Sequence, residues 1–390
     1  MSKSFLLRRR GLMERRTIVK TRFLENKQKI IEKRWIKALQ KDYKTAKVAF
    51  NRLLKLSAYQ LPASILLAAS KWDADKGSLL AEFNKLKKIL PIDLISKGDI
   101  GSISKFESKG IFGITDIGGR RNNEDAIAVF KHKGKIYLLL ADGVGGAADG
   151  EIASHLALLH MMVALEKDPH NLDAAIRKAS DMVKQGIEST GTPGTTLVVA
   201  MIEKDLVTVA HVGDSPIFLL KRSGELRLLT LPHSQTINMA RMIRDKDVKV
   251  FIKDGLPEEI KGELNKIDMD KPPFPFKLLY LINQVEEFMI GFTPFTRRMV
   301  GAVNRIVGIK VGDVIPIYNF RIQKGERLLL TSDGLDLTWH NRKGMNLGKV
   351  LVEAMNQTDR LGIRMHKFMQ VVRSLQGRDD DNASGIIYEA

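Results

Sequence analysis

Acidic side chains gather in four short clusters that lie far apart in the sequence. Crowding carboxylates together is costly unless something cancels their charge. Divalent cations do so, and a ligand set made only of oxygen favours hard ions such as Mg²⁺ or Mn²⁺. The clusters are Glu124-Asp125 in RRNNEDA, Asp142-Gly143 in LLLADGVGG, Asp333-Gly334 in LLLTSDGL and Asp381-Asn382 in RDDDNAS. These residue types predict a metal-assisted hydrolase.

The same residues suggest how such a hydrolase could act on a phosphate ester. Two metal ions ~3.5–4 Å apart can bind a bridging water, lower its pKa and clamp the phosphoryl oxygens. Asp142 is the best candidate for a bridging ligand, because it follows a strongly apolar run and precedes Gly143. Glycine has no side chain, so the carbonyl of Gly143 could approach a metal.

The residues around these clusters predict the strands and helices that must position them. The clearest strand-like apolar runs are 111–116, 136–141, 196–202, 206–212, 217–221, 327–331 and 383–388. Residues 151–165 and 173–188 predict helices. Because these elements do not alternate strictly, the pattern favours an α+β layered sandwich.

Two further segments frame this predicted catalytic domain, which we place at residues 110–390. Residues 1–95 predict a basic, all-helical domain with helices at about 15–57, 63–72 and 78–90, and residues 96–109 resemble a linker. Residues at about 235–310 begin charged, pass through a proline-rich stretch and end apolar. We interpret them as a helical insertion or flap within the catalytic domain.

The positive charge of the chain is concentrated near its N-terminus. Residues 1–60 contain 18 Lys and Arg but only 4 Asp and Glu, whereas the whole chain of 390 residues carries a net charge of +18. Three interpretations remain open: a solvated face whose apolar stripe packs on the body or on a second copy, a targeting arm, or a surface for an anionic partner such as RNA, the ribosome or acidic membrane lipid.

Composition excludes several classes of chemistry and suggests a location. The chain has no cysteine, so disulfides, thiolate nucleophiles and Cys-ligated zinc are excluded. The best candidate for a transmembrane segment, residues 56–70, is about 15 residues long, against the ~20 that a bilayer needs. The N-terminal apolar run is too short for a secretory signal. We therefore expect a cytoplasmic protein without a transmembrane segment.

Six sequence blocks, in order across residues 110–390, resemble the type 2C metal-dependent protein serine/threonine phosphatase (PPM) family, bacterial type. The blocks are GITDIGGRRNNEDA, ADGVGGAADGEIAS, GTPGTTL, VAHVGDSP, RLLLTSDGL and DDDNAS. The resemblance implies a four-layer α-β-β-α sandwich of two antiparallel sheets with two Mn²⁺ or Mg²⁺ ions at one edge. It also implies hydrolysis of phosphoserine and phosphothreonine by direct attack of a metal-bridging hydroxide.

The resemblance also implies roles for individual residues. Arg120 would orient the phosphate, with Arg121 as its rival, and Asp142 would bridge the metals. A third metal at Asp214 stays open, because the usual partner position holds Leu337, with Asp336 one residue early. The expected metal ligands are Glu124, Asp125, Asp142, Gly143, Asp333 and Asp381.

Other interpretations of these residues stay open. The acidic residues of each cluster could be ordinary turn residues. The metal ligand expected at Asp381 could instead be one of its acidic neighbours, 379 or 380. The histidines His155, His160 and His211 lie on apolar stretches and are expected in the core. Val144 and Pro232 stand where many members of the family have His and Asp. The alternative function is a catalytically impaired regulatory or binding protein that is recruited through its basic N-terminal helices.

Overall fold

The computed structural model describes residues 103–108, 110–120, 123–144, 148–186, 194–244, 257–290, 304–337, 346–375 and 381–390. The expected basic helical domain at 1–95 lies outside the described residues. Residues 103–108, which we expected in the linker, form strand β1 (Ile103–Ser108) and pair with β2 (Ile111–Asp116). The expected start of the folded body at residue 110 is therefore too late.

The seven predicted strands are all observed, and together with six strands that were not predicted they form two antiparallel sheets in the described part of the chain. The seven-stranded sheet has the order β1-β2-β13-β12-β8-β9-β10, and the six-stranded sheet, in which β5 pairs with β4 off the main path, has the order β11-β7-β6-β4-β3. The strands not yet given are β3 (Asp125–His132), β4 (Lys135–Val144), β5 (Gly194–Thr195), β6 (Leu197–Glu203), β7 (Leu206–Val212), β8 (Ile217–Leu220), β9 (Leu226–Leu228), β10 (Phe274–Pro275), β11 (Ile317–Arg321), β12 (Arg327–Thr331) and β13 (Ala383–Glu389).

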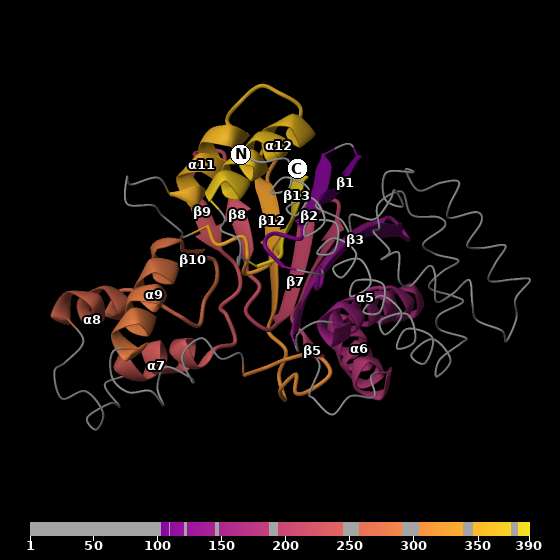
Figure 1. The fold of residues 1–390 in the computed structure, drawn as a ribbon, viewed down its shortest axis with the longest axis horizontal. Coiled ribbons are helices and arrows are strands. Elements are labelled where there is room, and N and C mark those ends of the chain that lie inside the picture. Colours follow the sequence, from indigo (N-terminus) through magenta and orange to yellow (C-terminus); the bar gives the residue numbers. More distant parts are fainter. Residues whose placement is uncertain are drawn as a thin grey trace, which may run out of the picture.

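Alternation along the strands divides the interior into three apolar cores. In β4, Leu139 packs beneath α5 (Ala148–Lys167) and α6 (Leu172–Gly186), while Leu138 and Leu140 face the other sheet. A third core lies beneath the helices on the outer face of the seven-stranded sheet. These helices are α7 (Gln235–Arg244), α8 (Glu258–Asn265), α9 (Lys277–Ile290), α11 (Leu347–Met355) and α12 (Leu361–Leu375). Three cores separate four layers, which confirms the predicted α-β-β-α sandwich (Figure 1).

The segment at 235–310 is joined to this sandwich rather than set apart from it. Its described part contains α7, α8 and α9, which contribute side chains to the outer core of the seven-stranded sheet. The strand β10 lies in the proline-rich stretch and extends this sheet, with Phe274 opposite Leu228 of β9. Among the described helices, none is both long enough and apolar enough to cross a bilayer.

Strand register brings the ends of both sheets to a common edge. Asp125, the first residue of β3, lies opposite Asp142 near the end of β4. In the other sheet, Thr331 at the end of β12 lies opposite Gly385 near the start of β13. The acidic residues that follow β12 and precede β13 therefore emerge at the same end of that sheet.

The two faces of β4 should contribute comparably to stability. Leu138 and Leu139 are both fully buried but belong to different cores, so Leu138→Ala and Leu139→Ala should each lower the free energy of unfolding by ~2–5 kcal/mol. Urea denaturation followed by circular dichroism measures the change. Val314→Ala, at a side chain that is 71% exposed, is the matched control and should change little. A negligible effect at either leucine would contradict the assignment of that core.

Candidate metal centre

Backbone contacts hold the first two acidic clusters side by side. The amide of Gly143 donates to the carbonyl of Glu124 (3.1 Å), beside the cross-strand pair of Asp125 and Asp142. Thr196 fixes Asp142 from the other side: its amide donates to the Asp142 carbonyl (2.8 Å), and its hydroxyl accepts from the Asp142 amide (3.0 Å). The position of Asp142 is thus set by the main chain on both sides.

The second sheet closes the same edge through small polar side chains. The hydroxyl of Ser332 donates to Oδ2 of Asp125 (2.8 Å) and accepts from the amide of Ser384 (2.9 Å). The side-chain oxygen of Asn382 accepts from the amide of Glu124 (2.8 Å). These contacts tie the third and fourth clusters to the first, so all four acidic clusters meet at one edge of the sandwich.

Close backbone approaches explain the glycines of the DG pairs. A Cβ atom on Gly143 would collide with the backbone of Gly150 at the start of α5, and one on Gly150 would collide with the carboxylate of Glu124. A Cβ atom on Gly334 would collide with the carbonyl of Asn382. Any side chain at these three positions would push the acidic clusters apart.

Burial and like charge raise the pKa of the carboxyl groups at this edge. Asp125 is only 3% exposed, and burial raises its pKa to about 7, whereas the nearby hydroxyl groups of Ser384 and Ser332 lower it. The charges of Asp333 and Asp381 raise it further. Oδ1 of Asp125 is buried and has no hydrogen-bond partner among the described residues. This oxygen is desolvated without compensation from the protein.

Asp142 and Asp333 belong to the same group of carboxylates. Burial raises the pKa of Asp142 well above its usual value, and the charges of Asp125, Asp333 and Asp214 act in the same direction. A hydrogen bond joins the two carboxyl groups, and it raises the pKa of Asp142 and lowers that of Asp333. Burial and Asp333 raise the pKa of Asp214 to about 7. These carboxyl groups therefore lie close enough together that a negative charge on one disfavours ionisation of another.

A guanidinium borders the acidic edge. Nη2 of Arg120 lies 2.6 Å from Oδ2 of Asp381, and these side chains are 50% and 42% exposed, respectively. Its rival, Arg121, lies outside the described residues, as do the acidic neighbours of Asp381 at 379 and 380. Of the two candidate arginines, the described one therefore lies beside an expected metal ligand.

The donor chemistry of this edge fits hard cations. Its side-chain donors are carboxylate oxygens, and Asp125 has an oxygen without a partner. Among the residues that the structure describes, no group of three or more acidic, histidine or cysteine side chains is arranged to hold a metal ion as it stands. Arg120 already occupies an oxygen of Asp381, and Asp142 is hydrogen bonded to Asp333. Cations would have to replace these contacts.

The region expected to complete a third site is only partly acidic. Asp214 lies within reach of the acidic group, since Asp333 affects its pKa. Leu337, at the position of the usual partner, is 1% exposed and belongs to the apolar core, whereas Asp336 is exposed. Of the two residues expected at a third metal site, Asp214 is therefore present, but position 337, where the second ligand is expected, holds an apolar leucine.

Sequence reasoning missed the hydroxyl groups that support the carboxylates. Ser332 directly precedes Asp333, and Ser384 follows the fourth cluster, but only folding brings both to Asp125. Thr196 lies in the GTPGTTL block, and its hydroxyl also bonds that of Ser215 (2.7 Å). The signal that could have found them is a small hydroxyl residue next to an acidic pair at a strand end.

The three histidines that we expected in the core are all buried. Nε2 of His211 donates to the carbonyl of Leu231 (2.7 Å), and Nδ1 of His155 lies 2.9 Å from the carbonyl of Glu151. His160 is 6% exposed.

The chain is similar in sequence to known protein serine/threonine phosphatases. The chain is 31% identical over 173 residues to the serine/threonine phosphatase Stp of Listeria welshimeri, covering 40% of this chain and 68% of that protein. It is 34% identical over 119 residues to the serine/threonine protein phosphatase PstP of Mycobacterium tuberculosis, covering 28% of this chain but only 22% of PstP. The chain thus spans about a fifth of the length of this second relative.

Solved structures show the same fold. The PPM Ser-Thr phosphatase MsPP of Mycobacterium smegmatis superposes with a TM-score of 0.50 at 20% identity, covering 75% of this chain and 99% of that one. A serine/threonine phosphatase from S. agalactiae gives a TM-score of 0.50 at 21% identity, covering 74% and 99%. The family model for protein phosphatase 2C matches residues 113–370, well over half of the chain. The chain therefore belongs to the protein phosphatase 2C family.

Proposed function

We propose that this chain is a metal-dependent protein serine/threonine phosphatase that removes phosphate from phosphoserine and phosphothreonine with two Mn²⁺ or Mg²⁺ ions. The observation that carries the proposal is the convergence of Asp125, Asp142, Asp333 and Asp381, with Arg120 beside them, at one edge of the sandwich. The names of the relatives in Listeria and Mycobacterium support the same activity.

Each acidic cluster has a role in this proposal. Glu124 and Asp125 would bind one cation, Asp333 and Asp381 the other, and Asp142 both. The carbonyl of Gly143 would add a further oxygen. When bound, the cations supply activation of water and neutralise charge on the phosphoryl group.

Arg120 would hold the phosphate of the substrate. Its side chain is half exposed and bonded to Asp381, so it can exchange this surface partner for a phosphate without losing a buried contact. A guanidinium can donate two parallel hydrogen bonds to phosphate oxygens, which fixes the orientation of the phosphorus for attack from the opposite side.

The side chains support attack by solvent rather than by the protein. The chain has no cysteine to act as a nucleophile. The hydroxyl of Ser332 is committed to Asp125 and to the amide of Ser384, and that of Ser384 donates to Thr115 (2.6 Å). Direct attack of water on phosphorus needs none of these groups to leave its partner.

Hydrolysis of p-nitrophenyl phosphate and of phosphoserine or phosphothreonine peptides should require Mn²⁺ or Mg²⁺. Asp142→Asn should lower turnover by at least about a hundredfold, because metal-based stabilisation of the transition state is worth several kcal/mol. The matched control is Asp205→Asn, at a surface carboxylate paired with Arg321, and it should retain full activity. Turnover without metal, or an Asp142→Asn variant as active as wild type, would exclude the mechanism.

Calorimetry with Mn²⁺ separates this proposal from the regulatory alternative. A phosphatase should bind two ions and turn over substrate under the same conditions. Tight binding of metal with no hydrolysis of any phosphopeptide would instead favour the catalytically impaired protein.

Arg120→Ala should lower kcat/KM for a phosphopeptide by roughly 10- to 100-fold, since a hydrogen bond to a charged group contributes ~1.5–3 kcal/mol. Affinity for Mn²⁺ should not fall, because the change frees Asp381 from its ion pair. Steady-state kinetics and calorimetry measure the two effects. Arg121→Ala is the matched control: if it alone impairs turnover, the phosphate ligand is Arg121.

Ser332→Ala should weaken Mn²⁺ binding by about tenfold, because it removes the hydroxyl that orients Asp125. Titration with Mn²⁺ measures the affinity, and circular dichroism checks the fold. Ser223→Ala is the control, since this hydroxyl accepts only a surface hydrogen bond from the amide of Glu225. Unchanged Mn²⁺ affinity in Ser332→Ala would remove Asp125 from the ligand set.

A further inference from the structure

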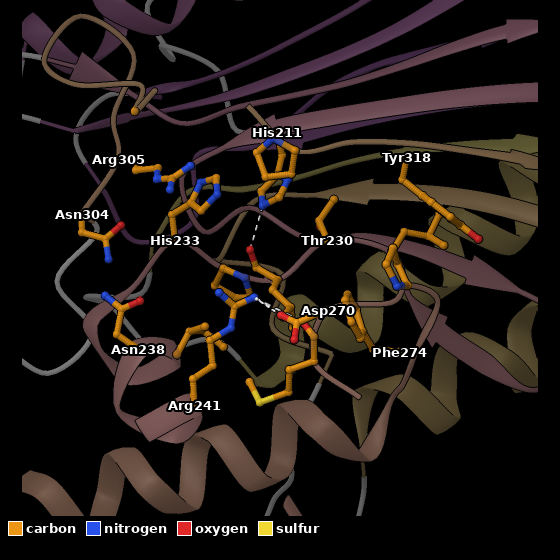
Figure 2. Close-up of a pocket in the computed structure, with 18 of the residues that line it drawn as sticks. His211, Thr230, His233, Asn238, Arg241, Asp270, Phe274, Asn304, Arg305 and Tyr318 are labelled. Carbon is orange, nitrogen blue, oxygen red and sulfur yellow. Dashed lines mark hydrogen bonds and ion pairs between the residues drawn. The ribbon is translucent and has the colours of Figure 1, made fainter. Parts of the chain in front are cut away.

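A cavity of about 700 Å³ lies beside the acidic edge, between the six-stranded sheet and the segment that carries α7. Its volume falls within the ~300–1,000 Å³ usual for pockets that bind small molecules. His211 of β7, Tyr318 of β11, Phe274 of β10 and Arg241 of α7 contribute to its wall (Figure 2). None of the expected metal ligands lines this cavity.

Cationic side chains line the cavity, and two of them, Arg241 and Arg305, lie toward one end (Figure 2). Arg241, Arg305 and Lys310 line it. Nη1 of Arg305 donates to the carbonyl of Val314 (2.7 Å), and no carboxylate of the described residues forms an ion pair with Arg305. Nε of Arg241 is buried and has no hydrogen-bond partner in the described part of the chain. Two guanidinium groups therefore keep donor capacity that the protein does not use.

Two carboxylates also line the cavity but do not cancel this charge. Asp270 lies 3.4 Å from Nη2 of Arg241 in an ion pair whose side chains are 63% and 42% exposed, respectively, so its contribution is small. Asp313 lies close enough to Arg177, which is outside the cavity lining, to raise the pKa of that guanidinium. Asp313 thus acts on a charge outside the cavity, whereas Asp270 offsets the charge of Arg241 only through a largely solvent-exposed ion pair.

His233 adds a neutral donor at the cationic end. Its ring stacks on His211 with centroids 4.4 Å apart, and its Nδ1 accepts from the amide of Gly213 (3.2 Å), which leaves its proton on Nε2. Burial, followed by His211, Arg305 and Arg241, lowers the pKa of His233 to about 2. Both arginines therefore create a positive potential at this ring.

The opposite end of the cavity is apolar and aromatic. Figure 2 places Arg305, His233, Asn238 and Arg241 toward one end, and Phe274 and Tyr318 toward the other. Binding sites for small molecules combine apolar walls with a few polar groups that fix orientation, and this cavity has that division. The helix α7 also presents its first residues to the cavity, the end of a helix that favours negative charge.

We propose that this cavity binds an amphipathic anion: a phosphate monoester or phosphonate whose charged group contacts Arg241 and Arg305 and whose aromatic body packs against Phe274 and Tyr318. The site is separate from the proposed metal centre but close to it. The amide of His233 donates to the carbonyl of Gly213 (2.9 Å), and a Cβ atom on Gly213 would lie 2.7 Å from the Thr196 side chain, which bonds the backbone of Asp142. A test must therefore separate the two sites.

Calorimetry on the full chain in EDTA makes this separation, because the chelator removes cations from the acidic edge. Phenylphosphonate and adenosine 5′-monophosphate serve as anions with aromatic bodies of different size. Methylphosphonate tests the anion alone, and adenosine tests the body alone. At least one aromatic anion should bind about tenfold more tightly than methylphosphonate and than adenosine. A tenfold difference in affinity is what the removal of one hydrogen bond to a charged group should cause. No such preference for either aromatic anion would overturn the proposal.

Substitutions locate the binding. Arg305→Ala and Arg241→Ala should each lower the affinity for the aromatic anion by about tenfold. Arg321→Ala, at an exposed arginine of β11 outside the cavity, should leave this affinity unchanged. Turnover of p-nitrophenyl phosphate should persist in Arg305→Ala. If Arg120→Ala abolishes binding and Arg305→Ala does not, the probes occupy the acidic edge and the cavity proposal is wrong. Because binding is measured without metal, it can fail or succeed independently of the phosphatase activity.

Discussion

Repulsion among carboxylates at the meeting edge of two sheets is the constraint on which the rest of this structure depends. Burial raises the pKa of Asp125 and of Asp142, and the charges of Asp125, Asp333 and Asp381 each raise the pKa of a neighbouring carboxyl group further. Such an arrangement destabilises the folded chain compared with an apolar edge. The free energy of binding a ligand must therefore offset the loss of stability that this arrangement causes. Divalent cations are the ligands that an edge rich in oxygen atoms and negative charge binds most strongly.

The four-layer architecture holds these charges together against their repulsion. Three apolar cores fix the two sheets relative to each other, so the acidic strand ends cannot move apart without exposing buried side chains. The contacts across the edge are short and made by small groups: Ser332 reaches Asp125, and Asn382 reaches Glu124. Glycine at 334 is needed for the same reason, because its backbone lies against Asn382. Rigidity at the edge thus comes from the cores and from close backbone packing.

The sequence predicted those features that depend on local pattern. Apolar runs ending in acidic residues indicated both the strands and the charged positions, and the continuous apolar run of β4 matches a strand that is buried on both faces. It did not predict β1, whose Lys, Ser and Glu residues are typical of a linker, or β10, because prolines rarely indicate a strand. The strands β3, β5, β9 and β11 were also not predicted. The bond from Ser332 to Asp125 spans 207 residues and depends on how the two sheets meet, which no local pattern encodes.

The position of Pro232 connects the acidic edge with the cavity. At the sequence level this proline was a reason to consider lost activity, because many members of the family have an aspartate there. In the structure it lines the cavity next to His233, rather than the acidic edge. A carboxylate at this position would add negative charge near Arg241 and Arg305 and compete with an anionic ligand. Proline adds none, so the departure from the family pattern leaves the acidic edge intact and keeps the cavity cationic.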